Sequence, residues 1–162
     1  MLDKLTKIPI CKGLTAAQAQ ELAAIAEETS AKKAEQLFKE GDVGDSIIVV
    51  LEGKIDIAKS GQQLAVISDG SVLGEMSLLG ESGRRTASAT ALSDVKLWKI
   101  NAAKFQALMA KDNLAALKVV GNLAQVIAKR LLAMNDKLVD GAKGKKKEEL
   151  ADFQKILSNW SF

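Results

Sequence analysis

Residues 74–88 read Gly-Glu-Met-Ser-Leu-Leu-Gly-Glu-Ser-Gly-Arg-Arg-Thr-Ala-Ser. Gly74 precedes a short apolar turn that can start a helix, and the exposed N–H groups of such a turn suit an anion. Arg85 follows soon after and offers a bidentate, charge-assisted fork to the same anion. Glu75 can accept a hydrogen bond from a sugar hydroxyl, and Thr86 adds a further donor. Together these groups suggest a nucleotide, although Gly-Glu and Arg-Arg pairs are also common on surface turns.

This stretch lies within a series of short strands that runs from about Thr29 to Ile100. β-Branched and apolar residues form short runs, and Gly, Asp and Ser residues separate these runs. Many short strands at regular spacing predict a sandwich or barrel. The expected strands cover residues 46–51, 54–58, 64–67, 72–73, 86–91 and 95–100.

Helices are expected before the strands. Thr15 and Gln18 form a capping box, which predicts a helix over about residues 16–28. A shorter helix near residues 2–7 would be stopped by Pro9, the only proline in the chain.

The pattern after Ile100 is helical. Phe105 and Leu108 mark one face of a short helix, and a longer helix is expected over about residues 113–139. Apolar residues three and four apart form a heptad seam along it: Leu117, Val120, Ala124, Ile127, Leu131, Met134 and Leu138. This seam favours a homodimer, and the alternative is that the same face packs on the chain's own strands. Gly121 would permit a close approach of two helices or a bend.

The last part of the chain changes composition. Residues 141–147 are rich in glycine and lysine, as in a flexible basic linker, and residues 148–160 can form a short amphipathic helix. We therefore divide the chain into a domain of residues 1–140, which includes the long helix, and a tail of residues 141–162.

The composition excludes several classes of function. The chain has 162 residues, of which 48% are hydrophobic and 27% charged, as in one globular domain. Its net charge of +3 is mild and its basic residues alternate with acidic ones, so we expect no nucleic-acid partner. We expect no membrane partner, because no signal peptide or apolar run of spanning length is present. A single cysteine fits a cytoplasmic location.

The residue types also argue against catalysis. One cysteine and no histidine cannot build the usual zinc site or supply an imidazole base. No phosphate-binding loop or dinucleotide motif is present. We therefore expect no enzyme, no catalytic residues, no metal and no cofactor.

The stretch over residues 74–88 resembles the phosphate-binding cassette of the cyclic nucleotide-binding domain family. Residues 74–79 are similar to its Gly-Glu-hydrophobic-Ala-Leu-Leu segment, and residues 85–88 to its Arg-small-Ala-Thr segment. Residues 39–46 and 51–54 resemble the turns around its first long strand. The resemblance implies an α+β, mainly β fold: an antiparallel, jelly-roll-like β-roll with N-terminal helices and a long C-terminal helix.

The resemblance also implies a role for each site residue. Arg85 would hold the cyclic phosphate and Glu75 the ribose 2′-hydroxyl, and Thr86 would contact the phosphate or a guanine base. The remaining cradle residues are Gly74, Met76, Ser77 and Ala87. Arg84 is the alternative to Arg85, which is preferred because Thr-Ala-Ser follows it directly.

The long helix resembles the dimerisation helix of catabolite activators. Arg130 matches an arginine that lies near the cassette glutamate in that family. Asn135 stands where the family contacts adenine, so it either reaches the base or is a solvated side chain. About twenty residues follow Asp140, too few for a DNA-binding winged helix.

Two functions of different classes follow. The first is a sensor that binds cAMP or cGMP, moves its C-terminal helices on binding and passes the signal to an effector protein. Trp160 or Phe162 of the tail would then cap the base. The second is a ligand-free interaction module that uses the heptad helix and the aromatic tail for dimerisation or docking.

Overall fold

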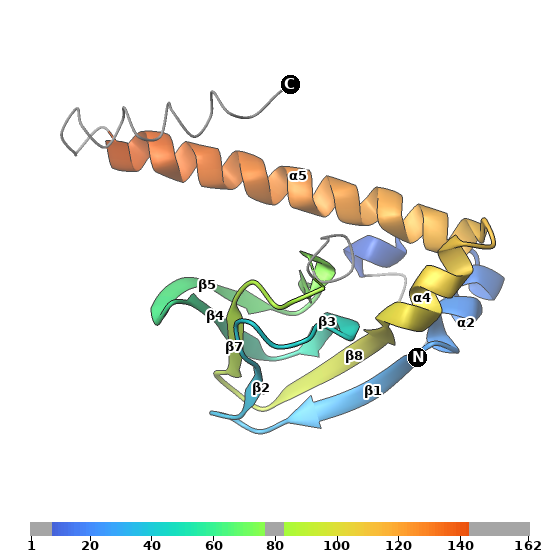
Figure 1. The fold of residues 1–162 in the computed structure, drawn as a ribbon, viewed down its shortest axis with the longest axis horizontal. Helices are drawn as coiled ribbons and strands as arrows, with labels where there is room; N and C mark the ends of the chain where they lie inside the picture. Colours follow the sequence, from blue (N-terminus) through green and yellow to red (C-terminus); the bar gives the residue numbers. More distant parts are fainter. Residues whose placement is uncertain (1–7, 77–82, 143–162) are drawn as a thin grey trace. The chain divides into compact units, whose positions relative to one another are not determined.

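The computed structural model describes residues 8–76 and 83–142, and it describes side chains as far as residue 136 (Figure 1). Its contacts divide the chain into two units, Met1–Leu123 and Ala124–Phe162, which we describe separately. The predicted domain of residues 1–140 and tail of residues 141–162 stay predictions.

The first unit consists of eight strands with short helices before and after them. The helices are η1 (Pro9–Cys11), α2 (Ala16–Ala23) and α4 (Ala102–Met109), followed by the start of α5 (Leu114–Ala142). The strands are β1 (Ala26–Ala31), β2 (Gln36–Phe38), β3 (Ser46–Glu52), β4 (Lys54–Lys59), β5 (Gln62–Ser68), β6 (Val72–Leu73), β7 (Ser88–Ala91) and β8 (Val95–Asn101).

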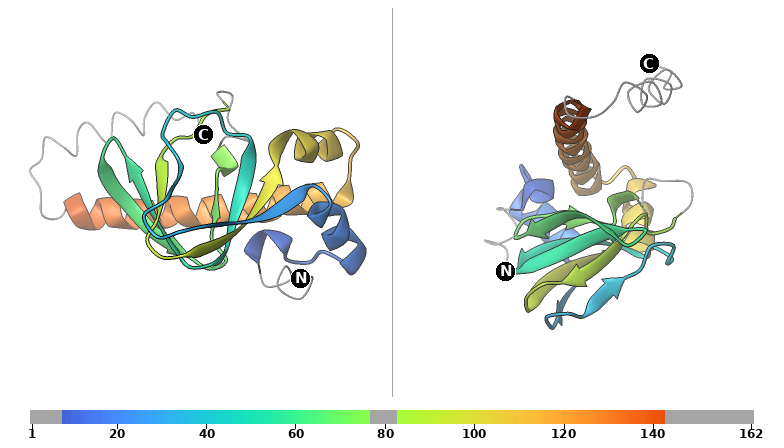
Figure 2. Two further views of the ribbon diagram at one scale, coloured as in Figure 1. Left: turned by 90° about the horizontal axis from the view of Figure 1, so that it is seen from below. Right: turned by 90° about the vertical axis from the view of Figure 1, so that its left-hand side faces the viewer.

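The strands form two antiparallel four-stranded sheets, in the orders β1-β8-β3-β6 and β2-β7-β4-β5. The two sheets face each other and curl into a roll, and α2 and α4 lie at one end of it (Figures 1 and 2). The predicted β-roll of an α+β, mainly β protein is therefore confirmed.

Strand β3 lies at the centre of the fold because both of its faces are buried. Ile48 and Val50 pack in the core between the sheets. Ile47 and Val49 point to the opposite face, where they pack with the N-terminal segment, α4 and the start of α5. This arrangement explains why an unbroken β-branched run, and not an alternating one, occurs at this strand.

The predicted capping box is confirmed, but the predicted end of its helix is wrong. The Thr15 hydroxyl accepts from the Gln18 N–H at 3.3 Å, and the Thr15 N–H donates to the Gln18 side chain at 3.0 Å. The helix ends at Ala23 and not near Glu28, because Ala26–Ala31 pairs with β8 along its whole length. The short helix expected near residues 2–7 lies outside the described residues.

The long helix is confirmed, and its face toward the core overlaps the predicted seam only in part: the seam residue Val120 packs against the core. The Asn113 side chain accepts from the Ala116 N–H at 3.1 Å at its start. Ala116, Val119 and Leu123 are buried in the core, whereas the seam residue Leu117 is 43% exposed. A Cβ on Gly121 would meet no atom of the described residues within 4 Å, so no described side chain approaches it closely.

Within the second unit, α5 carries exposed apolar side chains. Leu131, Leu132 and Met134 are 41%, 63% and 60% exposed. In the described part of the chain, no helix combines the length and the apolar character needed to cross a membrane.

Candidate functional site

Arg85 is a buried arginine, with 5% of its surface exposed. Its Nη1 donates to the backbone oxygen of Ser46 at 2.9 Å, and its Nη2 donates to the Ser46 hydroxyl at 3.1 Å. The guanidinium carbon lies 4.4 Å from the centre of the Phe38 ring, in cation–π geometry. Strands β2 and β3 thus hold this side chain in one place.

Carboxylates surround the Arg85 guanidinium. Asp45 Oδ1 lies 3.6 Å from Nη2 and also accepts from the Ser46 hydroxyl at 2.8 Å. Burial lowers the pKa of Arg85, and the charges of Asp45, Asp42 and Glu75 act in the opposite direction. An arginine stays charged at neutral pH under such a shift, so the fold holds a cation in a place with little solvent.

Gly74 passes so close to Arg85 that no other residue fits there. A Cβ added at Gly74 would lie 2.0 Å from Arg85 Nη1 and 2.8 Å from the Ser46 oxygen. The φ angle of Gly74 is +80°, which side chains other than glycine rarely adopt. We call Ser46, Gly74, Glu75 and Arg85 the Arg85 cradle.

The loop before β3 lies against the segment that carries Arg85. The backbone N–H of Arg85 donates to the backbone oxygen of Asp42 at 2.8 Å. The backbone N–H of Gly41 donates to the backbone oxygen of Arg85 at 2.9 Å. The Gly44 N–H donates to the Gly83 oxygen at 2.8 Å. The glycines and aspartates of residues 41–45 therefore build one wall of the site, a role that the sequence interpretation did not assign to them.

The other predicted cassette residues have different environments. Glu75 is 8% exposed and starts a helical turn, while Met76 is 45% exposed. Thr86 is exposed and Ala87 is half-buried, immediately before β7. Ser77 lies outside the described residues. The structure thus brings Gly74, Glu75 and Arg85 together, and the ligand contacts of all these residues stay predictions.

Arg84 differs from Arg85 although the two are neighbours. Arg84 is exposed, and its guanidinium donates to the Gly41 oxygen at 2.8 Å. It is therefore bonded to the loop before β3 and is not merely solvated. The burial of Arg85 beside Glu75 supports the preference for Arg85.

Two predicted ligand-binding residues lie on α5 beyond Leu123. Arg130 is half-buried and Asn135 is exposed within the second unit. Their part in the site stays a prediction. The aromatic lid, Trp160 or Phe162, lies outside the described residues.

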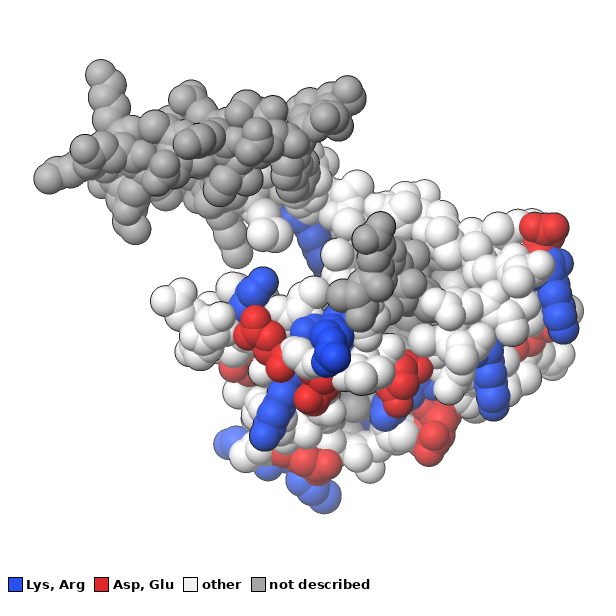
Figure 3. Space-filling view, viewed as in Figure 1, with Lys and Arg blue, Asp and Glu red and all other residues white. Residues whose placement is uncertain are grey.

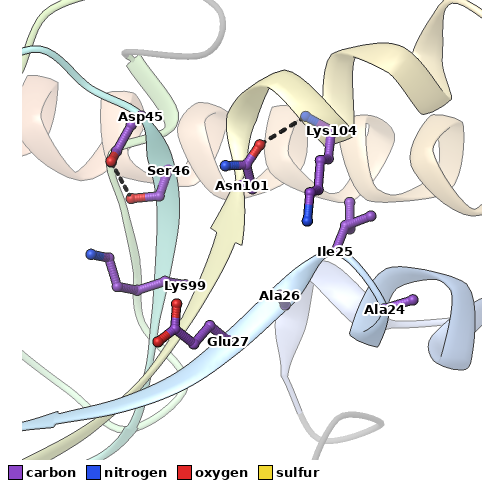
Figure 4. A pocket seen from close by; sticks show the side chains of 9 residues that line it. All are labelled: Ala24, Ile25, Ala26, Glu27, Asp45, Ser46, Lys99, Asn101 and Lys104. Carbon is purple, nitrogen blue, oxygen red and sulfur yellow. Dashed lines mark hydrogen bonds between the residues drawn. The ribbon is translucent and has the colours of Figure 1, made fainter.

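Asp45 and Ser46 also line a hollow of about 190 Å³ between β1, β3, β8 and α4 (Figure 4). Its charged lining residues are of both signs: Lys99, Lys104, Glu27 and Asp45. It contains none of the predicted site residues, so the candidate site is the Arg85 cradle and not this hollow.

A family model of the cyclic nucleotide-binding domain matches residues 28–112, which include the cradle and both sheets except the first two residues of β1. The chain is 35% identical over 104 residues to the cGMP-dependent protein kinase egl-4 of Caenorhabditis briggsae, covering 64% of this chain and 14% of the kinase. It is 38% identical over 104 residues to the Cyclic AMP receptor protein of Thermus thermophilus, covering 59% of this chain and 44% of that protein. The chain thus spans less than half of either relative.

Solved structures agree on the fold. A cyclic nucleotide-binding domain from Methylobacillus flagellatus superposes with a TM-score of 0.77, at 21% identity, and the match covers 86% of this chain and 83% of that one. At this identity the likeness supports the architecture of the roll and its helices.

Proposed function

The chain belongs to the cyclic nucleotide-binding domain family, and from this premise we propose that it is a sensor of cAMP or cGMP. The domain fold is a regulatory one, and the relatives named above are a cGMP-dependent kinase and a cyclic AMP receptor. The observation that carries the proposal is the buried Arg85, held beside Glu75 and against Gly74.

The cradle suits a cyclic phosphate diester. A guanidinium has five N–H donors in a fixed fork, and two phosphate oxygens match that fork. The carboxylate of Glu75 can accept a hydrogen bond from a ribose hydroxyl on the same ligand. We propose that Arg85 exchanges its bonds to Ser46 for bonds to the phosphate, while Gly74 leaves room for the exchange.

The same exchange of hydrogen bonds offers a way for ligand binding to affect helix α4. The backbone oxygen of Asp45 accepts from the backbone N–H of Ala102, the first residue of α4, at 2.8 Å. Asp45 and Ser46 therefore lie between the Arg85 guanidinium and the start of α4. A ligand that draws Arg85 away from Ser46 would change the support of α4, and it would shift the helices only as far as it binds one arrangement better.

Calorimetric titration with cAMP, cGMP and 5′-AMP tests this function. We expect micromolar or tighter binding of one cyclic nucleotide, and at least tenfold weaker binding of 5′-AMP. Slower or faster amide hydrogen exchange of residues 102–109 at ligand saturation would support the route through Asp45. Unchanged exchange there, with binding intact, would contradict the route but not the ligand.

A second candidate is a ligand-free interaction module. The exposed seam residues Leu131 and Met134 of α5 favour it, because apolar side chains three residues apart on a helix suit a partner helix. This function predicts an unchanged melting temperature in millimolar cAMP and cGMP. A homodimer through α5 is compatible with either candidate.

A further inference from the structure

The surroundings of Arg85 hold more negative than positive charge. Among the described residues, the buried charged side chains are Arg85 and Glu75. Asp45 adds a second carboxylate, whose Oδ1 lies 3.6 Å from Arg85 Nη2. Burial lowers the pKa of Arg85, and the charges of Asp45, Asp42 and Glu75 oppose this shift, so all three carboxylates act on the guanidinium. One cation thus lies among three carboxylates.

This balance limits how much negative charge a ligand can bring into the cradle. The first negative charge of a phosphate pairs with Arg85 once the guanidinium exchanges its bonds to Ser46. A second negative charge would meet no other buried cation among the described residues, and it would face the three carboxylates. Like charges repel, and a charge that leaves water without a partner is unfavourable.

The exposed cations near the cradle compensate the carboxylates only weakly. Arg84 and Lys39 are both exposed, and Arg84 donates to the backbone oxygen of Gly41. Exposed charges are screened by salt within about 8 Å at physiological ionic strength. On the face shown in Figure 3, acidic and basic side chains of the described residues are interspersed over the strands and form no large patch of one sign.

We propose that the cradle selects its ligand by charge, so that it binds a phosphate diester with one negative charge and discriminates against a monoester. A monoester carries a charge of about −1.5 to −2 at pH 7. This inference rests on the proposed function, because it concerns the same cradle, and it narrows the ligand class to singly charged phosphates. By this rule an open-chain nucleotide diester is discriminated against less than the monoester of the same nucleoside.

The three carboxylates contribute unequally to this selection. Glu75 is 8% exposed, so little water screens its charge. The Asp45 side chain is 74% exposed, and its charge acts mainly through its short distance to Arg85. We therefore expect a measurable but partial loss of selectivity when the charge of Asp45 alone is removed.

Titration calorimetry of the full chain with three ligands separates charge from shape. The ligands are cAMP, 5′-AMP and the methyl ester of 5′-AMP, or the guanosine set if cGMP binds more tightly. The methyl ester has the open shape of 5′-AMP and the single charge of cAMP. We expect it to bind at least fivefold more tightly than 5′-AMP at pH 8.

The outcomes of this titration distinguish the two proposals. If cAMP binds and the methyl ester binds no better than 5′-AMP, selection by charge is overturned and the proposed function stands. If none of the ligands binds, the proposed function is overturned together with this inference.

A change of pH alters the charge of the ligand without a change in its shape. The second ionisation of a phosphate monoester has a pKa of about 6, so 5′-AMP loses most of its second charge at pH 5.5. The chain has no histidine, and burial raises the pKa of the Cys11 thiol to about 12. The charged groups around the guanidinium are Asp42, Asp45, Glu75 and Arg84, and carboxyl and guanidinium groups ordinarily titrate outside the range from pH 5.5 to 8.

This pH change should therefore affect the monoester selectively. From pH 8 to pH 5.5, the ratio of the cAMP affinity to the 5′-AMP affinity should fall at least threefold. The affinity of the methyl ester, which does not titrate in this range, should change less than twofold. A ratio that is the same at both pH values would overturn selection by charge.

Removal of two carboxylate charges tests the protein side of the proposal. In the double variant Asp42→Asn and Asp45→Asn, each side chain keeps an oxygen that can accept a hydrogen bond. The ratio of the cAMP affinity to the 5′-AMP affinity at pH 8 should fall at least threefold, because the monoester gains more than the diester. Asp112→Asn is the control, since Asp112 is exposed in the turn between α4 and α5. Equal ratios in the double variant and the control would overturn the proposal.

Discussion

The Arg85 cradle and the distal half of α5 place their key side chains in opposite ways. In the cradle, Arg85 is buried and held by bonds to Ser46 within one folded unit. On α5, Leu131 and Met134 are exposed, and nothing described within their unit covers them. The first region has its geometry before any ligand arrives, whereas the second needs another surface to be buried.

Gly74→Ala should break the cradle most severely. The added methyl group would overlap Arg85 Nη1 and the Ser46 oxygen, so Arg85 must leave its place. We expect a loss of cyclic nucleotide affinity of more than about 100-fold, together with about 1–2 kcal/mol of stability from the backbone strain alone. Titration calorimetry and thermal unfolding measure the two effects.

Gly61→Ala is the matched control for this variant. Gly61 has a φ angle of +78°, close to the +80° of Gly74, but a Cβ there would meet no atom within 4 Å. Gly61→Ala should lose the same stability through backbone strain and keep its affinity for the cyclic nucleotide. Equal losses of affinity in both variants would show that strain, and not the approach to Arg85, is what matters.

Arg85→Ala should have the next largest effect. Hydrogen bonds to charged groups contribute about 1.5–3 kcal/mol each, so affinity should fall at least tenfold. Arg84→Ala removes a guanidinium of the same kind that is bonded to the Gly41 oxygen on the surface, and it should change affinity less than about threefold. Comparable losses of affinity in the two variants would contradict the assignment of Arg85 as the ligand-binding arginine.

Leu131→Asp tests the other side of the comparison. If the seam of α5 is the dimer contact, a buried charge there should raise the dimer dissociation constant at least tenfold. Leu132→Asp is the control, because Leu132 is adjacent and 63% exposed but lies off the seam. Sedimentation equilibrium that shows the same mass for both variants would exclude the seam as the interface.

Asn135→Ala should have the smallest effect. If Asn135 reaches the base, its loss should weaken binding about three- to tenfold, the value of one neutral hydrogen bond. Asp136→Ala, one residue along the same exposed turn, is the control. Equal affinities of Asn135→Ala and the unaltered chain would mean that this side chain is solvated.

The local patterns predicted most of the strands and the start of α2. The β-branched run from Ser46 and the alternating run from Lys54 became β3 and β4, because their sequences match strand geometry. The end of α2 was predicted wrongly, since residues 24–28 suit a helix locally, whereas the chain turns after Ala23 and residues 26–28 pair with β8. The strand β2 was missed because it has three residues and few local signals.

The cradle was predicted in part. The pattern over residues 74–88 indicated Gly74, Glu75 and Arg85, which the fold brings together. The partners Ser46 and Phe38 were missed, because their contacts with Arg85 span about forty residues of sequence and depend on how the two sheets close. The glycine and aspartate turn at residues 41–45 was the available signal, since such a rigid turn before a strand indicates a fixed wall.

A crystal structure of the full chain with the bound cyclic nucleotide tests the central claim most directly. We predict that two exocyclic phosphate oxygens lie within about 3.2 Å of the Arg85 guanidinium nitrogens and that Glu75 accepts from a ribose hydroxyl. At least one bond from Arg85 to Ser46 should be lost. A ligand bound through Arg84, or in a place where Arg85 keeps both bonds to Ser46, would contradict the account.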